Sequence, residues 1–388
     1  MTLKHVLMAA LATAMFAAPA HAQNNVKVGV ILPLTGPFTA IGRQVENGIK
    51  LYMAQKGDTA AGKKIEILVK DDGGNADATK RIAQELIANE KVAIIAGFGL
   101  TPLAMAAAPV ATQGKTPQIV MAAGTSAITQ ASPYIVRTSF TLPQSSVPIA
   151  DWAAKNGIKK VMTVVTDYGP GLDAEKWFSE TFTKAGGIVE GVRAPLKSPD
   201  FAPYLQKAAD AKPDAIFVFI PAGQSAQFMK QYRERGLDKS GIRLIGPGDV
   251  TDDEVLNDMG DVALGVVTAH LYSAAHESPE NKAYVEAFKK ANGVRPNFMS
   301  VGGYDGMHLI YEALKKTGGD ADADKLIAAM KGTSWISPRG PVSIDPDTRD
   351  IIQNIYIREV KSVSGELYNV EFATVENVKD PAKAAAAK

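Results

Sequence analysis

The sequence lacks cysteine altogether, because none of its 388 residues is a cysteine. This absence excludes disulfide bonds, cysteine-ligated metal ions and a lipid anchor on a cysteine. Histidine is scarce as well, with five residues and no H-E-x-x-H motif. The run "DDGGNAD" at 71–77 has glycine at the third position of a calcium loop, so we predict a turn with helix-capping carboxylates instead. We therefore expect neither a metal ion nor a cofactor.

The chain also lacks an excess of charge of either sign, with 42 basic and 41 acidic residues. It contains no basic run, whereas nucleic-acid-binding proteins usually show a basic patch or stripe. No segment after residue 22 is apolar over a length that could span a bilayer. These absences argue against a nucleic-acid partner and against a membrane-spanning segment in the mature chain.

The first 22 residues have the pattern of a secretory signal peptide. Lys4 supplies a positive start, an apolar run follows at 6–18, and "AHA" forms a small-residue cleavage site. We predict cleavage after Ala22, so that the mature chain begins at Gln23. An exported chain without cysteine suits the bacterial periplasm, and we expect it to be free of a lipid anchor.

Beyond residue 22, short apolar segments alternate with amphipathic ones in two series. The first series begins with "KVGVILPL" and ends with "PQIVMAAG", and the second begins with "KKVMTVVTD". Such alternation predicts parallel sheets covered by helices on both faces. The fold class is therefore α/β with two doubly wound lobes. The strand ends are rich in Gly, Pro, Thr and Asp and would border a ligand cleft between the lobes.

Three later segments depart from this alternation. Helical stretches at 280–293 and 303–318 have no strand between them, and we expect them to pack back on the first lobe. Residues 351–375 alternate apolar and polar side chains about a "VSGE" turn, which predicts a hairpin. The final "DPAKAAAAK" is predicted to be a polar tail with no core to join.

Nucleotide and hydrolase sites have weak support. The Walker pattern is absent, and "GFGLTP" at 97–102 matches only half of the dinucleotide fingerprint. Ser126 in "AAGTSAIT" lies at a strand-to-helix turn, as a nucleophile would, but G-x-S-x-G is absent. No histidine follows at a matching strand end, since His270 and His308 are remote. A hydrolase stays open as an alternative.

Two predicted helix starts carry neutral hydrogen-bond donors that suit a carboxylate. Thr101 is placed as an N-cap, with Pro102 as the first helical residue. The free N–H groups and the positive end of a helix attract anions. Gly124, Thr125 and Ser126 offer a second set of N–H groups and hydroxyls. Ordinary helix capping is the alternative interpretation at both places.

The whole mature chain resembles the periplasmic solute-binding proteins of branched-chain amino acid type ABC uptake systems. Four stretches carry this resemblance: "VGVILPLTGPFTAIG", "DDGGNADATKRIAQELIANEKVAIIAGFG", "GTSAITQASPYIVRTSF" and "VVTDYGPGLDAEKWF". It implies two Rossmann-like lobes with parallel central sheets, joined by three crossover strands near 137–144, 268–274 and 334–341. The implied lobes are 23–140 plus 271–336 and 141–270 plus 337–375, with 376–388 as the polar tail.

The resemblance also implies ligand-binding positions. A Ser or Thr after the third strand and the turn after the fourth hold the ligand carboxylate in the family, and a Tyr in the "D-x-Y-G" turn closes over the ligand. The matching residues here are Thr101, then Ala122, Gly124 and Thr125, and then Tyr168. Phe38 and Ile41 fall where the first loop lines the side-chain pocket.

One departure from the family pattern concerns the ligand itself. In amino-acid binders an acid after "GP" in the second lobe pairs with the ligand ammonium, but Gly248 stands there and Asp249 follows one residue later. "IPAGQ" puts Ala222 and Gly223 where bulkier groups could stand. Burying an ammonium without its acid is costly. The ligand would then be an aromatic acid, reaching toward Gln224 or Asp249. Alternatively, Asp249 still pairs with an amino acid.

The expected function is that of a periplasmic substrate-binding component of an ABC uptake transporter, without catalysis. We expect a monomer that captures a small carboxylate, of benzoate or phenylpropenoate type, and delivers it to a membrane permease. Branched-chain or other hydrophobic amino acids are the alternative ligands. A periplasmic sensor or hydrolase on a similar fold is a further alternative.

Overall fold

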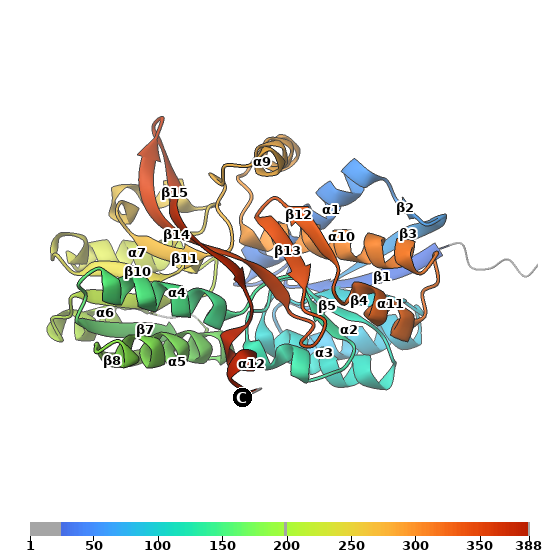
Figure 1. Ribbon diagram of the computed structural model, residues 1–388, viewed down its shortest axis with the longest axis horizontal. Coiled ribbons are helices and arrows are strands. Elements are labelled where there is room, and N and C mark those ends of the chain that lie inside the picture. The colour runs from blue at the N-terminus through green and yellow to red at the C-terminus, as the bar shows by residue number, and fades with distance from the viewer. Residues whose placement is uncertain (1–24, 198–199, 387–388) are drawn as a thin grey trace, which may run out of the picture.

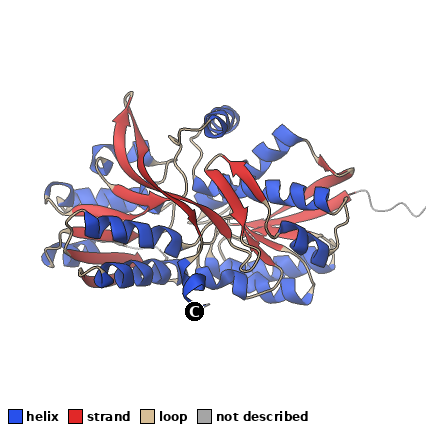
Figure 2. Ribbon diagram, in the orientation of Figure 1, coloured by secondary structure: helices blue, strands red, loops and turns tan. Residues whose placement is uncertain are grey.

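The computed structural model describes residues 25–197 and 200–386, and it forms two α/β lobes side by side (Figure 1). The predicted signal peptide and its cleavage site after Ala22 lie outside the described residues. Each lobe has a central sheet with helices packed against it, as the colouring by secondary structure makes plain (Figure 2). Within the described ranges, no helix combines the length and the apolar character that crossing a bilayer requires.

The first lobe is built on a six-stranded sheet in the order β2-β3-β1-β4-β5-β6. Its strands are mutually parallel except for β2, which is antiparallel to β3. The β1 sequence "VKVGVIL" is apolar almost throughout because helices cover both faces of a parallel sheet. The bounds are β1 Asn25–Leu32, β2 Thr59–Ala60, β3 Lys63–Asp71, β4 Ile94–Gly97, β5 Gln118–Val120 and β6 Ile135–Arg137. The helices that alternate with these strands are α1 Thr39–Lys56, α2 Ala76–Ala88 and α3 Thr101–Gln113.

The second lobe is built on a nine-stranded sheet. Its parallel part has the order β11-β10-β9-β7-β8, and β14, β13 and β12 extend it with antiparallel pairing. The strands are β7 Lys160–Thr166, β8 Ile188–Ala194, β9 Ala215–Phe219, β10 Arg243–Pro247, β11 Val267–His270, β12 Ser334–Ser337, β13 Gly340–Ile344, β14 Ile351–Val363 and β15 Glu366–Val378. The helices are α4 Leu142–Lys155, α5 Gly169–Lys184, α6 Ala202–Asp210, α7 Ser225–Glu234 and α8 Leu256–Met259.

Three late helices return to the first lobe: α9 Pro279–Asn292, α10 Phe298–Lys316 and α11 Ala323–Met330. The predicted packing of the first two is confirmed, because α10 lies along α1 and α9 contacts it too. Glycines allow the close approach of α1 and α10. A Cβ on Gly48 would lie 2.0 Å from the Ser300 carbonyl oxygen, and one on Gly303 would lie 2.3 Å from that of Val45.

The chain passes between the two sheets three times, after β6, after β11 and between α11 and β12. The third passage precedes the predicted range 334–341, because β12 and β13 already pair within the second sheet. The fully buried Arg339 guanidinium forms hydrogen bonds to segments of both lobes near these passages. It donates to the Asp305 carboxylate on α10, to the Ser139 carbonyl at 2.9 Å and to Gln353 on β14. The predicted lobe boundaries stay a prediction.

The end of the chain differs from its prediction. The hairpin about residues 364–365 is confirmed, since β14 and β15 pair from Val363↔Glu366 onward. The prediction of a polar tail with no core to join is wrong for the described part of 376–388. β15 runs to Val378 and is followed by the short helix α12, Pro381–Ala386. Asp380 and Lys383 are buried there because each finds a polar partner, Ser126 and Asp350 respectively.

The turn at 71–77 is a strand-to-helix turn, as predicted, but a different residue caps the helix. The Asn75 side chain accepts hydrogen bonds from the Asp77 and Ala78 N–H groups at the start of α2. Asp72 instead accepts from the Thr79 hydroxyl at 2.8 Å. The capping group is therefore an amide and not a carboxylate.

Candidate functional site

A small cavity of about 20 Å³ lies where the carboxyl ends of the strands of the two lobes face each other. This volume lies far below the range of about 300–1,000 Å³ for small-molecule pockets, so side chains nearly fill the space between the lobes. Six predicted site residues line it: Ile41, Thr101, Ala122, Gly124, Tyr168 and Asp249. Both lobes therefore contribute side chains to one enclosed space.

Thr101 is the first residue of α3 and not its N-cap, which corrects the sequence prediction. Leu100 occupies the N-cap position with extended backbone angles and makes no side-chain capping bond. The Thr101 hydroxyl lies 2.7 Å from the Thr125 hydroxyl, and either group can donate. Because the hydroxyl is not used for capping, it is available to a ligand in the cavity.

The turn after β5 presents backbone donors to the same end of the cavity. The Ala123 N–H bonds to the Phe98 carbonyl, whereas the described residues offer no hydrogen-bond partner to the N–H groups of Ala122 and Gly124. Glycine at position 124 lets the lining pack closely, because a Cβ there would lie 2.6 Å from the Leu142 side chain, which would have to shift. Free N–H groups beside the N-terminal end of α3 make this end of the cavity suited to an anion.

The second lobe contributes an aromatic wall. Tyr168 precedes α5, and its ring stacks on Phe219 with the centroids 6.2 Å apart. Burial raises the pKa of the Tyr168 hydroxyl well above its ordinary value, and the charge of Asp249 adds to this effect. The hydroxyl therefore keeps its proton at neutral pH. Pro221 and Ala222 continue this apolar wall.

Asp249 is a buried carboxyl group with a free oxygen. It follows β10 in a short 3-10 turn, and its Oδ2 atom has no hydrogen-bond partner in the described structure. Burial, and secondly the charge of Asp252, raises the pKa of Asp249 to about 8. The group is therefore mostly protonated at pH 7 and can donate a hydrogen bond as well as accept one.

The backbone at Gly248 leaves no room for a side chain. A Cβ there would lie 2.0 Å from Nη2 of Arg358 and 2.4 Å from Cγ of His270. Arg358 is held by Thr268 Oγ1 at 3.0 Å and by the Gly248 carbonyl at 3.1 Å. A guanidinium cation thus stands where the resemblance places the acid for a ligand ammonium. This explains the departure from the amino-acid pattern in physical terms.

Three predicted residues do not line the cavity. Phe38 is buried in the core at the start of α1, Thr125 lies behind Thr101, and Gln224 donates to the Leu196 carbonyl at 3.0 Å. A Cβ added to Gly223, next to Gln224, would lie 4.0 Å from the Pro37 carbonyl oxygen. These residues therefore shape the surroundings of the cavity and not its surface.

Sequence reasoning missed several apolar residues of the lining. Phe140 and Leu142 come from the first passage between the lobes, Met299 from the first turn of α10, and Phe219 from the end of β9. Phe219 ends a predicted strand and could have been found from the strand-end rule. The other three carry no local signal, because only the tertiary fold brings them to the cleft.

The lobes touch each other around the cavity, so the cleft is closed. A Cβ on Gly169 in the second lobe would lie 2.5 Å from the Thr125 hydroxyl oxygen in the first lobe. The Ser126 N–H donates to the Asp173 carboxylate across the cleft at 2.8 Å. Closure around a ligand brings groups from both lobes into contact with it.

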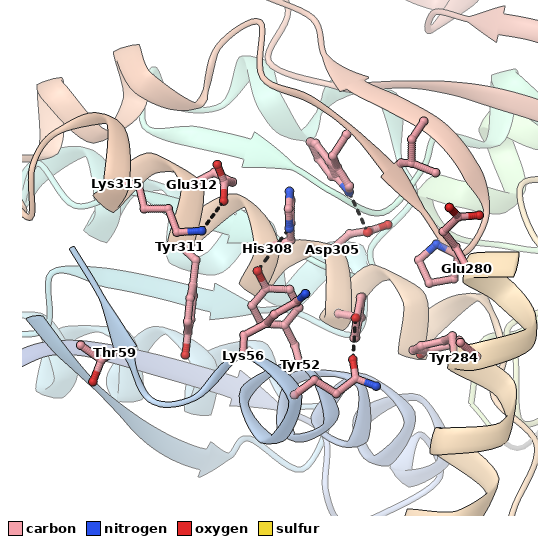
Figure 3. Close-up of a pocket in the computed structure, with 16 residues that line it drawn as sticks. Tyr52, Lys56, Thr59, Glu280, Tyr284, Asp305, His308, Tyr311, Glu312 and Lys315 are labelled. Carbon is pink, nitrogen blue, oxygen red and sulfur yellow. Dashed lines mark hydrogen bonds and ion pairs between the residues drawn. The ribbon is translucent and has the colours of Figure 1, made fainter. Parts of the chain in front are cut away.

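A second and larger hollow of about 440 Å³ lies on the first lobe, where α1 and α10 meet β12 (Figure 3). Tyr52, Tyr304 and Tyr311 line it, and their hydroxyls bond to His308, Gln55 and the Gly57 carbonyl. None of the buried unpaired polar atoms of the described residues belongs to its lining. The cavity between the lobes is therefore the better candidate site.

Comparisons with known proteins agree on the class of protein. The sequence profile of the periplasmic binding protein family matches residues 25–366. The Leu/Ile/Val-binding protein homolog 6 of Brucella abortus (strain 2308) is 47% identical over 98% of this chain and 99% of its own.

Two solved structures are similar over nearly the whole chain. One is a solute-binding protein of an ABC transporter from Rhodopseudomonas palustris BisB5, in complex with 3,4-dihydroxybenzoic acid. It is 66% identical with a TM-score of 0.92 and covers 93% of this chain and 99% of that one. The other, from Rhodopseudomonas palustris HaA2, is in complex with p-hydroxybenzoic acid. It is 44% identical with a TM-score of 0.90, covering 93% of this chain and 100% of that one.

Proposed function

This chain belongs to the periplasmic binding protein family, and we propose that it captures a hydroxylated aromatic carboxylate for an ABC uptake transporter. The proposal concerns the ligand, its orientation in the cleft and the delivery of the ligand to a permease. The two similar structures in complex with hydroxybenzoates support it, and so do the chemical groups around the cavity.

The carboxylate would bind in the first lobe. The Thr101 hydroxyl and the N–H groups of Ala122 and Gly124 face one end of the cavity, and the N-terminal end of α3 adds a favourable field. These donors are neutral, so the site holds one negative charge without a buried cation of its own. Ser126 and Thr125 support this loop from behind.

The ring would lie against the aromatic wall. Tyr168 and Phe219 form one side, and Phe140 comes from the passage between the lobes. A ring buried among aromatic side chains gains both from the area that it buries and from ring contacts of about 0.5–1.5 kcal/mol each. Aliphatic side chains gain only the first of these.

The observation that carries the proposal is the buried, unpaired Oδ2 atom of Asp249. A protonated carboxyl at this place can donate to, or accept from, a phenolic hydroxyl that enters from the ring. An unsatisfied buried polar group costs about 1–3 kcal/mol. A ligand hydroxyl removes this cost, so hydroxylated acids are preferred over benzoate itself.

Branched-chain amino acids are the second candidate, and the name of the Brucella relative favours them. Their ammonium group would require Asp249 to ionise in the cleft. Burial opposes this ionisation, and the Arg358 guanidinium fills the alternative acid position next to Gly248. The geometry therefore favours a carboxylate without an ammonium group.

Isothermal calorimetry of the purified mature protein tests the proposal. We expect 4-hydroxybenzoate and 3,4-dihydroxybenzoate to bind more tightly than benzoate, by roughly 5- to 100-fold from the hydrogen bond alone. We expect no heat with leucine or valine. Tight binding of leucine with no response to the aromatic acids would overturn the proposal and establish the amino-acid alternative.

A further inference from the structure

The loop that follows β5 is held from two sides through a single residue, Ser126. Its N–H donates to the carboxylate of Asp173 at 2.8 Å, and its hydroxyl donates to the carboxylate of Asp380. Ser126 is 6% exposed and lies two residues after Gly124, which lines the cavity at the end proposed for the carboxylate. Its position therefore sets the position of the ligand-facing turn.

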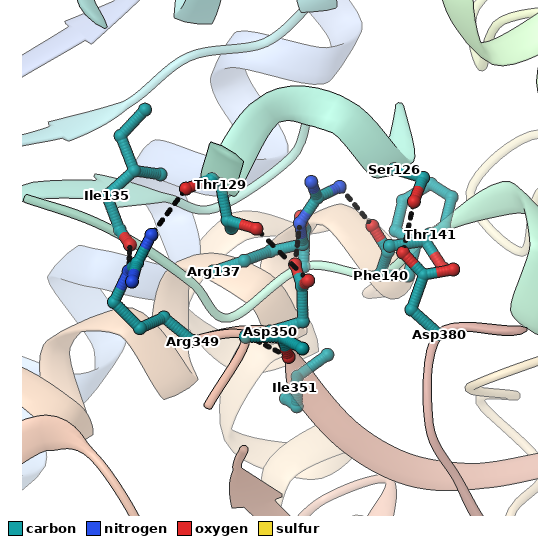
Figure 4. A network of polar contacts seen from close by, with 12 residues as sticks. Ser126, Thr129, Ile135, Arg137, Phe140, Thr141, Arg349, Asp350, Ile351 and Asp380 are labelled. Atoms are coloured by element: carbon teal, nitrogen blue, oxygen red, sulfur yellow. Dashed lines mark hydrogen bonds and ion pairs between the residues drawn. The ribbon is translucent and has the colours of Figure 1, made fainter. Parts of the chain in front are cut away.

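The two carboxylates belong to different parts of the chain. Asp173 lies on α5 in the second lobe, so its contact with Ser126 joins the two lobes across the cleft. Asp380 lies between β15 and α12, and Figure 4 shows it beside Ser126. One contact thus crosses the cleft, whereas the other comes from the end of the chain.

Further polar contacts anchor this region. The buried Arg137 guanidinium donates to the Thr125 carbonyl at 2.6 Å. It also pairs with Asp350 at 2.8 Å (Figure 4). Lys383 of α12 pairs with the same Asp350 and donates to Thr129. The last described helix is therefore part of the support of the loop, in spite of its polar, alanine-rich sequence.

We propose that Asp173 and Asp380 are positioning residues for ligand capture: Asp380 holds Ser126 from the end of the chain, and Asp173 latches onto Ser126 when the cleft closes. Neither residue touches the ligand. This inference rests on the proposed function, because it assumes that closure traps a carboxylate at the turn of Gly124 and Thr125. It predicts that the latch slows ligand release and leaves the encounter rate unchanged.

The latch is tested with Asp173→Ala in the full mature chain. The lost hydrogen bond to a charged group should speed release of 4-hydroxybenzoate by roughly 10- to 100-fold in stopped-flow measurements, with little change in the association rate. The melting temperature of the ligand-free protein should stay within error, because the open form lacks this contact. Glu180→Gln is the matched control, since it removes a carboxylate from an exposed site on the same helix.

An unchanged release rate in Asp173→Ala would overturn the latch. So would an equal loss of melting temperature with and without ligand, because that pattern indicates a contact that is present whether the cleft is open or closed. Asp173→Asn keeps an acceptor for the Ser126 N–H and should recover a large part of the slow release. This recovery separates positioning from a general loss of structure.

The role of Asp380 is tested by a double-mutant cycle with Ser126→Ala and Asp380→Ala. If the hydroxyl and the carboxylate act as one unit, the double variant should bind no more weakly than either single variant. Amide hydrogen exchange of residues 124–130 should be faster in all three. Additive losses of affinity, or losses of stability without change in affinity or exchange, would contradict the proposal.

The wild-type protein separates the failure of this inference from the failure of the proposed function. If calorimetry shows binding of leucine and not of aromatic acids, the proposed function fails. The latch can then still be tested by comparing the release rates of leucine from the wild-type protein and from Asp173→Ala. If the wild-type protein binds neither class of ligand, both proposals are wrong.

Discussion

The hydroxyls of Thr101 and Thr125 lie 2.7 Å apart and join the start of α3 to the turn after β5. One hydroxyl donates within the pair, so the other proton and the remaining lone pairs can serve a ligand. Because Leu100 and not Thr101 is the N-cap, the pair has no part in capping the helix. Binding and stability can therefore be separated at this site.

Thr101→Val should weaken binding with little effect on folding. The substitution keeps the shape and removes the hydroxyl, so one hydrogen bond to the carboxylate is lost, which costs about 1.5–3 kcal/mol in binding. Calorimetry with 4-hydroxybenzoate and urea unfolding of the ligand-free protein measure the two effects. Unchanged affinity together with lower stability would indicate a structural role only.

Asp249→Leu should reduce the advantage of hydroxylated acids. Without a carboxyl at this place, a ring hydroxyl would be buried without a partner, while benzoate would lose nothing. We expect the ratio of the benzoate Kd to the 4-hydroxybenzoate Kd to fall by roughly tenfold, corresponding to about 1.4 kcal/mol. Equal losses for both ligands would show that Asp249 acts on the carboxylate or on closure instead.

The stability of the closed protein should fall as the pH rises from about 4 to about 8. Burial raises the pKa of Asp249 from 3.8 to about 8, so the closed state binds a proton that the unfolded chain releases in this window. This contribution is fully present below the unfolded pKa and is lost as the pH rises through the folded pKa. Melting temperatures of ligand-bound protein across this range measure it, and Asp249→Asn should flatten the slope.

Asp252 is a second carboxyl with a raised pKa, of about 7, mainly because of burial. It lies in the same turn region and accepts from Asn297 at 2.9 Å. Part of the pH dependence should therefore survive in Asp249→Asn. A slope identical to that of the wild-type protein would show that Asp249 does not take up the proton.

Gly248→Ala should destabilise the protein. The new Cβ would lie 2.0 Å from Nη2 of Arg358, so the guanidinium or the backbone must move. Overpacking of this kind costs about 1–3 kcal/mol. Urea unfolding measures the loss, and an unchanged midpoint would mean that Arg358 can shift freely.

Arg339→Met should lower stability by about 3–5 kcal/mol, because it leaves the buried carboxylate of Asp305 without its cation. The ion pair connects the passage between the lobes to α10, so the unfolding of the two lobes should also become less cooperative. Arg339→Met combined with Asp305→Leu should recover part of the loss. Urea unfolding followed by tryptophan fluorescence and by circular dichroism compares the variants.

The sequence predicts the fold well because strand–helix alternation is a local signal. The strand ends at Thr101, Ala122 and Gly124 follow from the same signal, and they do meet at one cavity. The N-cap prediction failed by one residue, since helix starts are set by backbone angles that the residue types only bias.

Contacts between residues far apart in the chain could not be predicted from the sequence. Nothing local shows that Met299 and Phe140 would meet Tyr168, or that Asp380 would find Ser126. The terminal segment was misjudged because its composition is polar, whereas burial here depends on partners that lie far away in the chain. A charged side chain can be buried where the fold supplies an ion-pair or hydrogen-bond partner, and the composition of a segment does not reveal such a partner.

The packing of α1 against α10 has a consequence for the order of events during synthesis. The Gln44 side chain donates a hydrogen bond to the carbonyl of Arg295, which lies 251 residues later in the sequence. The backbone of Ser300 packs closely against Gly48. The amino-terminal part therefore leaves the apolar side of α1 uncovered until α10 is in place. Such distant pairing slows folding and prolongs exposure to aggregation. A fragment ending before residue 295 would consequently lack the helix that covers α1, so the first lobe cannot be completed without the later part of the chain.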